Sequence, residues 1–459
     1  MEKFITNIKD ISAENEYRMS PTYYKVLQNF KDAENCIPLN SPDIVVESGS
    51  YIRNYVDCNN GIPYLRVNNE KNYIIDESEM VYVDKNVKDK MKLLENDIIF
   101  GRTQANLDKL GVFSIIDKKM EGSSISQHVS KIRIKNNIIS PYYLIAYLNS
   151  KFGKSQMAYA TYGDTRVELT HSQVKKMKVI LLDESVRNIV SENSKIIIEN
   201  NRMALNALKE AQDYILEKIG YNKKEKNNKY NVKFYDLKEN DIWNVTNYKP
   251  EYVSISRFIE DNTNYTTLNE LIKENIKTGY EVGSKNYLIE FEKKAEDYAF
   301  IRTSDIINNT VDIYPDYFVN PHSIPHNKIP KLEKNDILFS KDAKIGETTV
   351  VCGDEKIIPC SGYTIIKIDE NKVNPQYVFA VLTLNIIKDQ ALQKTVIAST
   401  IPHLKINKLG KIKIPILSVE DQKYVGGLVE KFIELNRIKN EKVIENKRIL
   451  DEEYDKLFK

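Results

Sequence analysis

The sequence predicts an α+β protein built as a tandem duplication, in which a globular mixed α/β domain followed by a long helix occurs twice. Two stretches have apolar residues spaced by threes and fours, one ending at Ile219 and one at the end of the chain. Their apolar stripes agree in register, since Leu417 lies 235 positions after Leu182. Several shorter blocks also occur twice in the same order, which indicates a duplicated chain.

The two long stretches are predicted helices. In the first, the apolar stripe runs from Val186 to Ile219, and no proline or glycine interrupts it before Gly220. Such a helix would be roughly 50 Å long at about 1.5 Å per residue. Because neither helix can bury its stripe alone, we expect them to pack as an antiparallel coiled coil or against a partner's helices. The alternative is that both are long core helices.

Composition limits the possible functions. The chain has 459 residues, of which 41% are hydrophobic and 29% charged, and its formal net charge is +2. No apolar run reaches the roughly 18 residues of a membrane span, and the N-terminus lacks the apolar core of a signal peptide, so we expect a cytoplasmic protein. The four cysteines and five histidines show no metal-ligand spacing, so we expect no metal. Any affinity for nucleic acid must come from local clusters of charge.

The repeated blocks predict the elements of each globular domain. Each repeat has an opening segment, a short strand that leads into a polar loop, an Asn-Asp turn followed by a buried strand, and a helix with proline in its first turn. In chain order the pairs are Lys3–Ile11 with Lys233–Ile242, Gly61–Asn69 with Asp297–Ile306, Leu93–Arg102 with Leu332–Lys341, and Ile139–Ser150 with Val373–Leu384. Tyr162–Leu182 then aligns without gaps to Ile397–Leu417, so that Thr165 corresponds to Thr400.

The repeats give predicted domain boundaries. The first globular domain covers residues 1–183, and the first long helix covers 184–220. A polar, basic and aperiodic segment at 221–232 is a predicted linker. The second globular domain covers 233–417, and the second long helix covers 418–459.

The order and content of these blocks resemble the DNA-specificity subunit of a type I restriction-modification system. The resemblance rests on GIPYLRVNN and YAFIRTSDI, on ENDIIFGR and KNDILFSK, on Asp164-Thr165 and Ser399-Thr400, and on IKIPILSVEDQKYV before the last helix. The first repeat departs from the last of these, since MKVILLDESVRNIV has neither its proline nor its E-x-Q pattern. Outside the blocks the repeats diverge, as residues 41–60 and 271–296 show.

The resemblance implies that each globular copy is a target-recognition domain that reads one half of a bipartite double-stranded DNA target. It further implies that the two helices set the distance between the halves and dock adenine methyltransferase subunits, with restriction or translocase subunits in some assemblies. The cofactors would then be bound by the partners: S-adenosylmethionine, and in some assemblies ATP and Mg. For this chain itself we expect no cofactor.

Motifs for catalysis are missing from the sequence. There is no FxGxG-like cofactor loop, no (N/D)PP(Y/F) tetrapeptide and no GxxxxGK[ST] phosphate loop. Asp43 with Glu47 resembles part of a nuclease carboxylate set, but no ExK motif follows. We therefore expect a non-catalytic subunit.

Polar and cationic residues just beyond strands are the candidates for DNA contact, because long side chains there can reach groove edges and phosphates. In the first repeat they are Arg66, Asn68, Arg102, Gln104, Thr165 and Arg166. In the second repeat they are Arg302, Ser304, Lys341, Lys344, Thr400 and His403. The alternatives are that Arg66 and Arg302 form ion pairs within the fold and that the two threonines cap helices.

Polar residues within the helical stripes are candidates for partner binding: Asn193, Asn200, Lys439 and Asn446. In a seam between helices such residues could instead fix the register, or on an exposed edge have no role. Two other functions stay open for the whole chain. One is a two-headed scaffold that binds proteins and no DNA, and the other is the recognition subunit of another type of restriction-methylation enzyme.

Overall fold

The computed structural model describes residues 29–30, 33, 35–87, 91–104, 111–160, 167–221, 232, 234, 243–289, 294, 296–353, 355–398 and 401–458. The chain forms two compact units: the first contains Met1–Asn201 and Arg437–Lys459, and the second contains Arg202–Asn436. Helices α6 (Glu184–Lys218) and α13 (Val419–Phe458) occupy the stretches where the apolar spacing predicts long helices. Each of these helices contributes one part to each unit.

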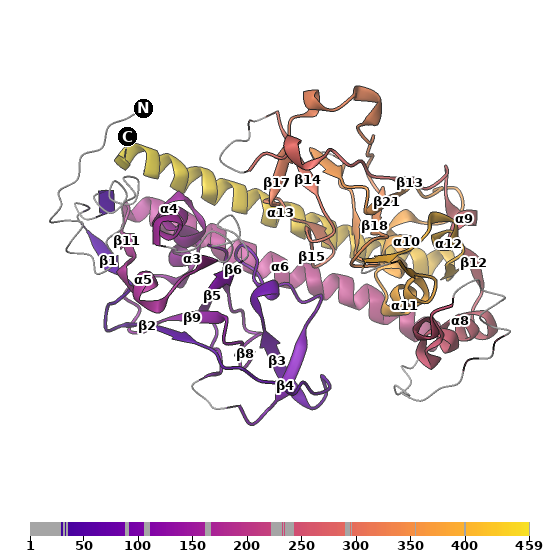
Figure 1. Cartoon of the computed structure of the whole chain (residues 1–459), viewed down its shortest axis with the longest axis horizontal. Helices are drawn as coiled ribbons and strands as arrows, with labels where there is room; N and C mark the ends of the chain where they lie inside the picture. The colour runs from indigo at the N-terminus through magenta and orange to yellow at the C-terminus, as the bar shows by residue number, and fades with distance from the viewer. Residues whose placement is uncertain are drawn as a thin grey trace. The chain divides into compact units, whose positions relative to one another are not determined.

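Two small sheets organise the first unit (Figure 1). One has the order β2-β9-β5-β7 and is antiparallel throughout. The other has the order β4-β3-β8, in which β3 pairs antiparallel with β4 and parallel with β8. The strands of the unit are β1 (Cys36–Pro38), β2 (Ile44–Ser48), β3 (Gly61–Leu65), β4 (Val81–Asp84), β5 (Ile98–Gly101), β6 (Thr103–Gln104), β7 (Phe113–Ile115), β8 (Ser124–Ile125), β9 (Val129–Ile134), β10 (Val167–Glu168) and β11 (Lys178–Ile180).

The second unit has two sheets with the corresponding connections. Their orders are β13-β21-β18-β19, again antiparallel, and β17-β14-β20, in which β14 pairs antiparallel with β17 and parallel with β20. The strands are β12 (Tyr265–Thr267), β13 (Lys277–Thr278), β14 (Tyr298–Ile301), β15 (Ile306–Ile307), β16 (Thr310–Val311), β17 (Tyr317–Val319), β18 (Ile337–Ser340), β19 (Thr348–Val350), β20 (Ile357–Pro359), β21 (Tyr363–Ile366), β22 (Val396–Ala398), β23 (Ile401–His403) and β24 (Lys413–Pro415).

Short helices complete each unit, and two of them begin as their sequences predict. Pro141 starts α3 and Pro375 starts α10, each after a cap residue whose side chain accepts a backbone N–H, Ser140 and Asn374 respectively. In the first unit the short α-helices are α3 (Pro141–Asn149), α4 (Lys151–Ala160) and α5 (His171–Lys176). In the second they are α8 (Pro250–Asn262), α9 (Leu268–Leu271), α10 (Pro375–Leu382), α11 (Asn385–Gln393) and α12 (Ile406–Leu409).

The repeated Asn-Asp turn has the same construction in both units. Asn96 and Asn335 have φ of 70° and 72°, a left-handed conformation that asparagine tolerates better than most residues. The following aspartate then accepts the backbone N–H of the residue three positions before it, at 2.9 Å from Leu94 to Asp97 and 2.8 Å from Glu333 to Asp336. Each turn thereby leads into a buried strand, β5 or β18.

In the first unit, α13 contacts α6 through buried polar side chains and α4 through an aromatic cluster. The Nδ2 atom of Asn446, on α13, donates to the Val190 carbonyl at 3.2 Å and to the Ser194 hydroxyl at 3.1 Å, both on α6. Near the end of α13, Tyr454 and Phe458 pack their rings against Phe152 of α4. The last turns of the chain are therefore part of the first unit's core.

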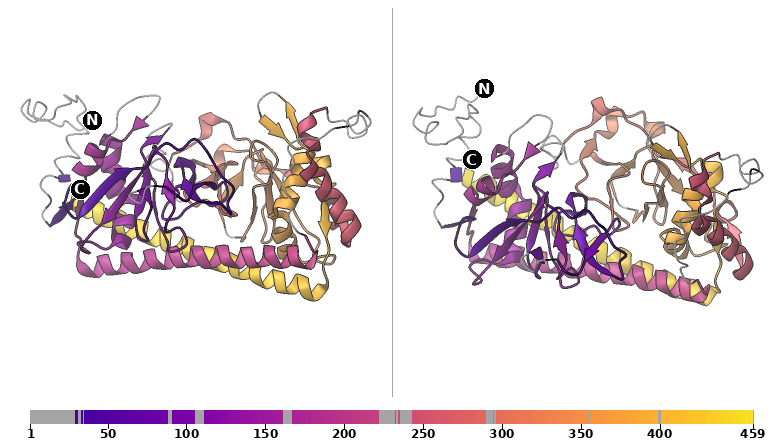
Figure 2. Two further views of the ribbon diagram at one scale, coloured as in Figure 1. Left: turned by 90° about the horizontal axis from the view of Figure 1, so that it is seen from below. Right: turned by 60° about the horizontal axis from the view of Figure 1, so that its bottom comes forward.

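In the second unit, the remaining parts of α6 and α13 run antiparallel, as Figure 2 shows. The Tyr424 hydroxyl donates to Glu210 at 2.8 Å, and the Lys218 ammonium lies 2.9 Å from Asp421. The apolar stripe of α6, which includes Leu208 and Ile215, joins the same core cluster as α10 and α13. Among the described helices, none is long and apolar enough to cross a membrane.

Asp97 offers a test of how the first unit is held together. Its buried carboxylate accepts two hydrogen bonds from the Arg133 guanidinium, at 2.7 and 2.6 Å, besides the Leu94 N–H. We expect Asp97→Ala to lower the free energy of unfolding by about 3 kcal/mol, because it leaves a partly buried arginine without its carboxylate. Urea denaturation of the full chain measures the change. Lys118→Ala, which removes an exposed ion pair with Glu121, is the control and should have no measurable effect; equal losses in both variants would contradict the interpretation.

Candidate nucleic-acid interface

The first unit has an open cavity of about 240 Å³ beside the end of β3. We call it the Tyr51–His128 cavity. Its apolar and aromatic lining consists of Tyr51, Ile52, Tyr55, Tyr64 and Val67. Tyr51 and Tyr55 are 67% and 53% exposed, whereas Tyr64 is buried. Exposed aromatic rings at a cavity provide contact area for a planar or apolar group of a ligand.

The remaining lining of the Tyr51–His128 cavity is polar: Arg66, Asn68, Ser126, Gln127 and His128. No carboxylate is among the described residues that line it. The Arg66 guanidinium donates to the Glu79 carbonyl oxygen at 3.0 Å and makes no ion pair with any described residue. A cavity with aromatic walls, amides and an unneutralised cation suits a ligand that has planar rings and negative charge.

A close approach of two backbones puts the tyrosines at this position. Gly49 lies against the turn that follows β8, where a Cβ atom would overlap the carbonyl oxygens of Ile125 and Ser126. The approach is closed by two backbone hydrogen bonds, from Gly49 to Val129 at 3.1 Å and from Ser50 to Ile125 at 3.2 Å. The Tyr64 hydroxyl also donates to the Ser50 carbonyl at 2.6 Å. The segment that starts at Tyr51 therefore emerges beside Gln127 and His128.

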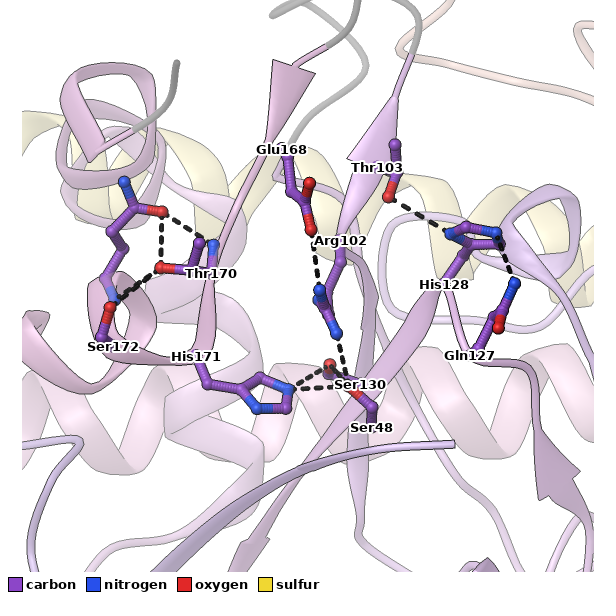
Figure 3. A network of polar contacts seen from close by, with 11 residues as sticks. Ser48, Arg102, Thr103, Gln127, His128, Ser130, Glu168, Thr170, His171 and Ser172 are labelled. Carbon is purple, nitrogen blue, oxygen red and sulfur yellow. Dashed lines mark hydrogen bonds and ion pairs between the residues drawn. The ribbon is translucent and has the colours of Figure 1, made fainter. Parts of the chain in front are cut away.

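A chain of hydrogen bonds orients Gln127 at the cavity (Figure 3). The Gln127 Nε2 atom lies 3.1 Å from His128 Nε2. An amide nitrogen can only donate, so His128 Nε2 accepts and the proton of the neutral ring is on Nδ1. Nδ1 in turn faces the Thr103 hydroxyl oxygen at 3.4 Å. The exposed Gln127 side chain is thus held by one of its two amide N–H groups, and its Oε1 and its second N–H are not used in this hydrogen bond.

Arg102, one residue before Thr103, belongs to a second polar network in the same view (Figure 3). Its guanidinium donates to the Ser48 hydroxyl at 2.7 Å and to the Glu168 carboxylate at 2.8 Å. The Nε2 atom of His171 lies 2.9 Å from both the Ser48 and the Ser130 hydroxyls. Burial, followed by the positive charges of Arg102 and Lys175, lowers the pKa of His171. The ring is therefore neutral near pH 7.

The other candidates of the first repeat have different surroundings. Asn68 is exposed and, with Arg66, lines the Tyr51–His128 cavity. Gln104 lies on β6, where its backbone pairs with Val167 of β10. Thr165 and Arg166 lie outside the described residues, so their predicted DNA contacts stay predictions.

In the second unit, Arg302 is held within the fold. Its guanidinium pairs with the Asp316 carboxylate, its Nε lies 3.6 Å from Asp305, and it stacks over the Tyr317 ring at 4.6 Å. Ser304, next to it, is exposed and donates to Asp305 at 2.9 Å. These ion pairs agree with the alternative that Arg302 has a structural role.

Two of the remaining candidates of the second unit, Lys341 and His403, contact Asp342. The Lys341 ammonium, on a side chain only 10% exposed, lies 2.6 Å from one carboxylate oxygen of Asp342, and His403 Nδ1 contacts the other. The Lys344 carbonyl accepts the Ser340 hydroxyl, and the Lys344 side chain is partly buried. Thr400 lies outside the described residues.

The two units share the backbone framework around these sites. Arg102 and Lys341 make corresponding backbone hydrogen bonds. The Arg102 N–H donates to the carbonyl of His128, in the turn after β8, and the Arg102 carbonyl accepts from the Leu169 N–H. The Lys341 N–H donates to the carbonyl of Gly362, in the turn after β20, and the Lys341 carbonyl accepts from the Leu404 N–H. Gly279 repeats the close approach of Gly49, now against Pro359 and Cys360. In the turn after β8 the first unit has Gln127-His128, and in the corresponding turn after β20 the second unit has Ser361-Gly362.

Comparison with known proteins identifies a domain in the second half of the chain. Residues 280–446 match the family model described as "Type I restriction modification DNA specificity domain". Residues 280–446 are therefore similar to a type I DNA specificity domain. This confirms, for these residues, the family resemblance of the repeated blocks.

The solved structures that the comparison matched to this chain include two specificity subunits. The S subunit of a type I restriction-modification system from M. genitalium is 13% identical, with 92% of this chain and 96% of that chain covered and a TM-score of 0.38. The HsdS subunit from Thermoanaerobacter tengcongensis is 16% identical, with 91% and 97% covered and a TM-score of 0.28. No curated protein matches the sequence.

The four residues predicted to bind partner subunits are buried within this chain. Asn193, Asn200, Lys439 and Asn446 are between 0% and 7% exposed. The contacts of Asn446 are to α6 of this chain and, at 3.5 Å, to the Tyr73 hydroxyl. The predicted contact of these four residues with a partner subunit stays a prediction.

Of the residues that line the Tyr51–His128 cavity, only Arg66 and Asn68 were predicted, and those missed include Tyr51, Tyr55, Gln127 and His128. The tyrosines belong to residues 41–60, where the two repeats diverge, and Gln127 and His128 lie in a turn outside the repeated blocks. The sequence difference between the two repeats at these positions was therefore the signal that could have identified these residues. In the described part of the chain, nowhere do three or more His, Cys, Asp or Glu side chains gather as metal ligands would.

His171 makes the stability of the first unit depend on pH. Its folded pKa is lowered, so the unfolded chain takes up a proton at a higher pH than the folded chain does. The stabilising contribution of the neutral ring is complete above the ordinary histidine pKa, about 6.5, and is lost as the pH falls from there through the folded value. We expect His171→Gln to remove this loss. Urea denaturation at pH 7.5 and 5.5 measures it: the stability of the wild type should fall more than that of the variant, and equal falls would contradict the role of His171.

Proposed function

We propose that the chain is the DNA-specificity subunit of a type I restriction-modification system and that each unit reads one half of a bipartite DNA target. The specificity-domain match at residues 280–446 supports DNA as the ligand. The main observation is that both units build the same framework, yet present different residues at the turn, Gln127-His128 and Ser361-Gly362. Two units that share a backbone framework but differ in their exposed side chains are suited to a DNA target with two different halves.

The proposal includes a tandem duplication of a target-recognition domain and a long helix. The domains would be residues 1–183 and 233–417, with the helices at 184–220 and 418–459 and the linker at 221–232. The corresponding strand orders of the two units support the duplication. The contacts between α6 and α13 within each unit support their pairing as an antiparallel coiled coil.

The chain would leave the chemistry to other subunits. Its partners would be double-stranded DNA, adenine methyltransferase subunits and, in some assemblies, restriction or translocase subunits. S-adenosylmethionine, and in some assemblies ATP and Mg, would be bound by those partners. Such a subunit is non-catalytic and works on DNA in the cytoplasm.

Binding to a random-sequence duplex tests the proposal most simply. We expect the full chain to retain the duplex in an electrophoretic shift at about 50 mM salt and to lose affinity steeply towards about 200 mM, because phosphate contacts release counterions. A protein-binding scaffold would show no salt-sensitive retention, and that result would refute DNA as the ligand.

Substitution of Arg66 tests whether the Tyr51–His128 cavity faces DNA. Arg66→Ala should reduce the slope of log affinity against log salt by roughly one, since the cavity loses one phosphate-contacting cation. Arg448→Ala is the matched control, because Arg448 lies on the part of α13 in the same unit and pairs with Glu452. Its slope should equal that of the wild type. If Arg66→Ala also leaves the slope unchanged, the cavity does not face the phosphates.

A further inference from the structure

We propose that the Tyr51–His128 cavity is a base-reading site and that Gln127 reads adenine in the half-site of the first unit. This inference rests on the proposed function, since it needs DNA as the ligand. It differs from the expectation drawn from the sequence, because Gln127 is not among the polar and cationic residues predicted to contact DNA. Instead it assigns the readout to an oriented amide on the turn after β8.

The orientation of the Gln127 amide is the first argument. Reading adenine in the major groove requires an amide that accepts from N6 and donates to N7 at the same time. His128 Nε2 accepts one Nε2 proton of Gln127, and Nδ1 of the same ring lies 3.4 Å from the Thr103 hydroxyl oxygen. Among the described residues nothing else bonds to the exposed Gln127 side chain, so its Oε1 and its second N–H are available to a base. This pair has the polarity that adenine requires.

The surroundings of Gln127 are the second argument. Tyr51 and Tyr55 offer exposed rings, which can make apolar contact with a thymine methyl group in an A·T pair. Asn68 adds a second exposed amide, and Arg66 supplies a cation for a nearby phosphate. The absence of carboxylates from the described lining keeps the site compatible with the DNA backbone.

The third argument is that Arg102 is committed to the fold. Its guanidinium bonds to Ser48 and Glu168, and its side chain is only 24% exposed. Its backbone N–H donates to the His128 carbonyl at 2.8 Å. Arg102 therefore positions the turn that carries Gln127, and the exposed amide is the better placed reader.

The second unit provides an internal comparison. Its corresponding turn carries Ser361 and Gly362, which have no amide side chain and no ring to orient one. The adenine preference should therefore belong to one half of the target only. His128 is a positioning residue for this readout, and the corresponding glycine has no such function.

Selection of bound duplexes from a random pool by the full-length chain, followed by sequencing, tests the inference. We expect Gln127→Ala to lower the preference for adenine at one position of one half-site by roughly 5- to 150-fold. Gln127→Glu should shift that position towards cytosine, whose N4 amino group donates to a carboxylate. His128→Ala should relax the same position, because it removes the ring that orients the Gln127 amide.

The controls separate this inference from the proposed function. Ser361→Ala should leave the half-site of the first unit as it is in the wild type, and circular dichroism should show all variants folded, since Gln127 and His128 are exposed. If the wild type enriches a two-part motif and the Gln127 variants enrich the same motif unchanged, the base-reading role is overturned and DNA recognition stands. If the wild type shows no salt-sensitive retention of duplex, both are overturned.

Discussion

Both units depend on one steric constraint: a strand-end segment lies so close to a neighbouring turn that only glycine fits between them. Gly49 meets Ile125 and Ser126, and Gly279 meets Pro359 and Cys360. The backbone hydrogen bonds across each approach fix where the following residues emerge, at Ser50 in one unit and Tyr280 in the other. A side chain at either glycine would separate the segment from the turn. The constraint therefore sets the position of the surface that we assign to DNA, while the residues after it remain free to vary.

Polar networks make this surface rigid without using the residues that face the ligand. In the first unit Arg102 is bound by Ser48 and Glu168, and in the second Arg302 is bound by Asp316 and Asp305. A recognition site needs such supporting contacts, because a loosely held reader loses both affinity and discrimination. Lys341 is held in the same way, by an ion pair with Asp342.

Periodicity and repetition predicted much of the fold, and the site much less. The spacing of Val190, Ile197, Leu208 and Ile215 predicted α6, and all four residues are buried. The Asn-Asp blocks predicted β5 and β18, because asparagine in a left-handed turn followed by an apolar run is a strong local signal. The cavity could not be predicted in this way. Tyr51, Gln127 and Arg66 are brought together by pairing between segments that are distant in the sequence. The sequence also does not reveal whether the guanidinium of a strand-end arginine forms an ion pair within the fold.

The central claim is that one framework, used twice with different side chains, reads a target with two unlike halves. Sequencing of methylated bases in cells that produce this chain together with a type I adenine methyltransferase subunit tests it most directly. The account predicts methylation within a motif of two different short blocks separated by a fixed number of unspecified bases. A single uninterrupted motif, or a motif with two identical halves, would contradict it.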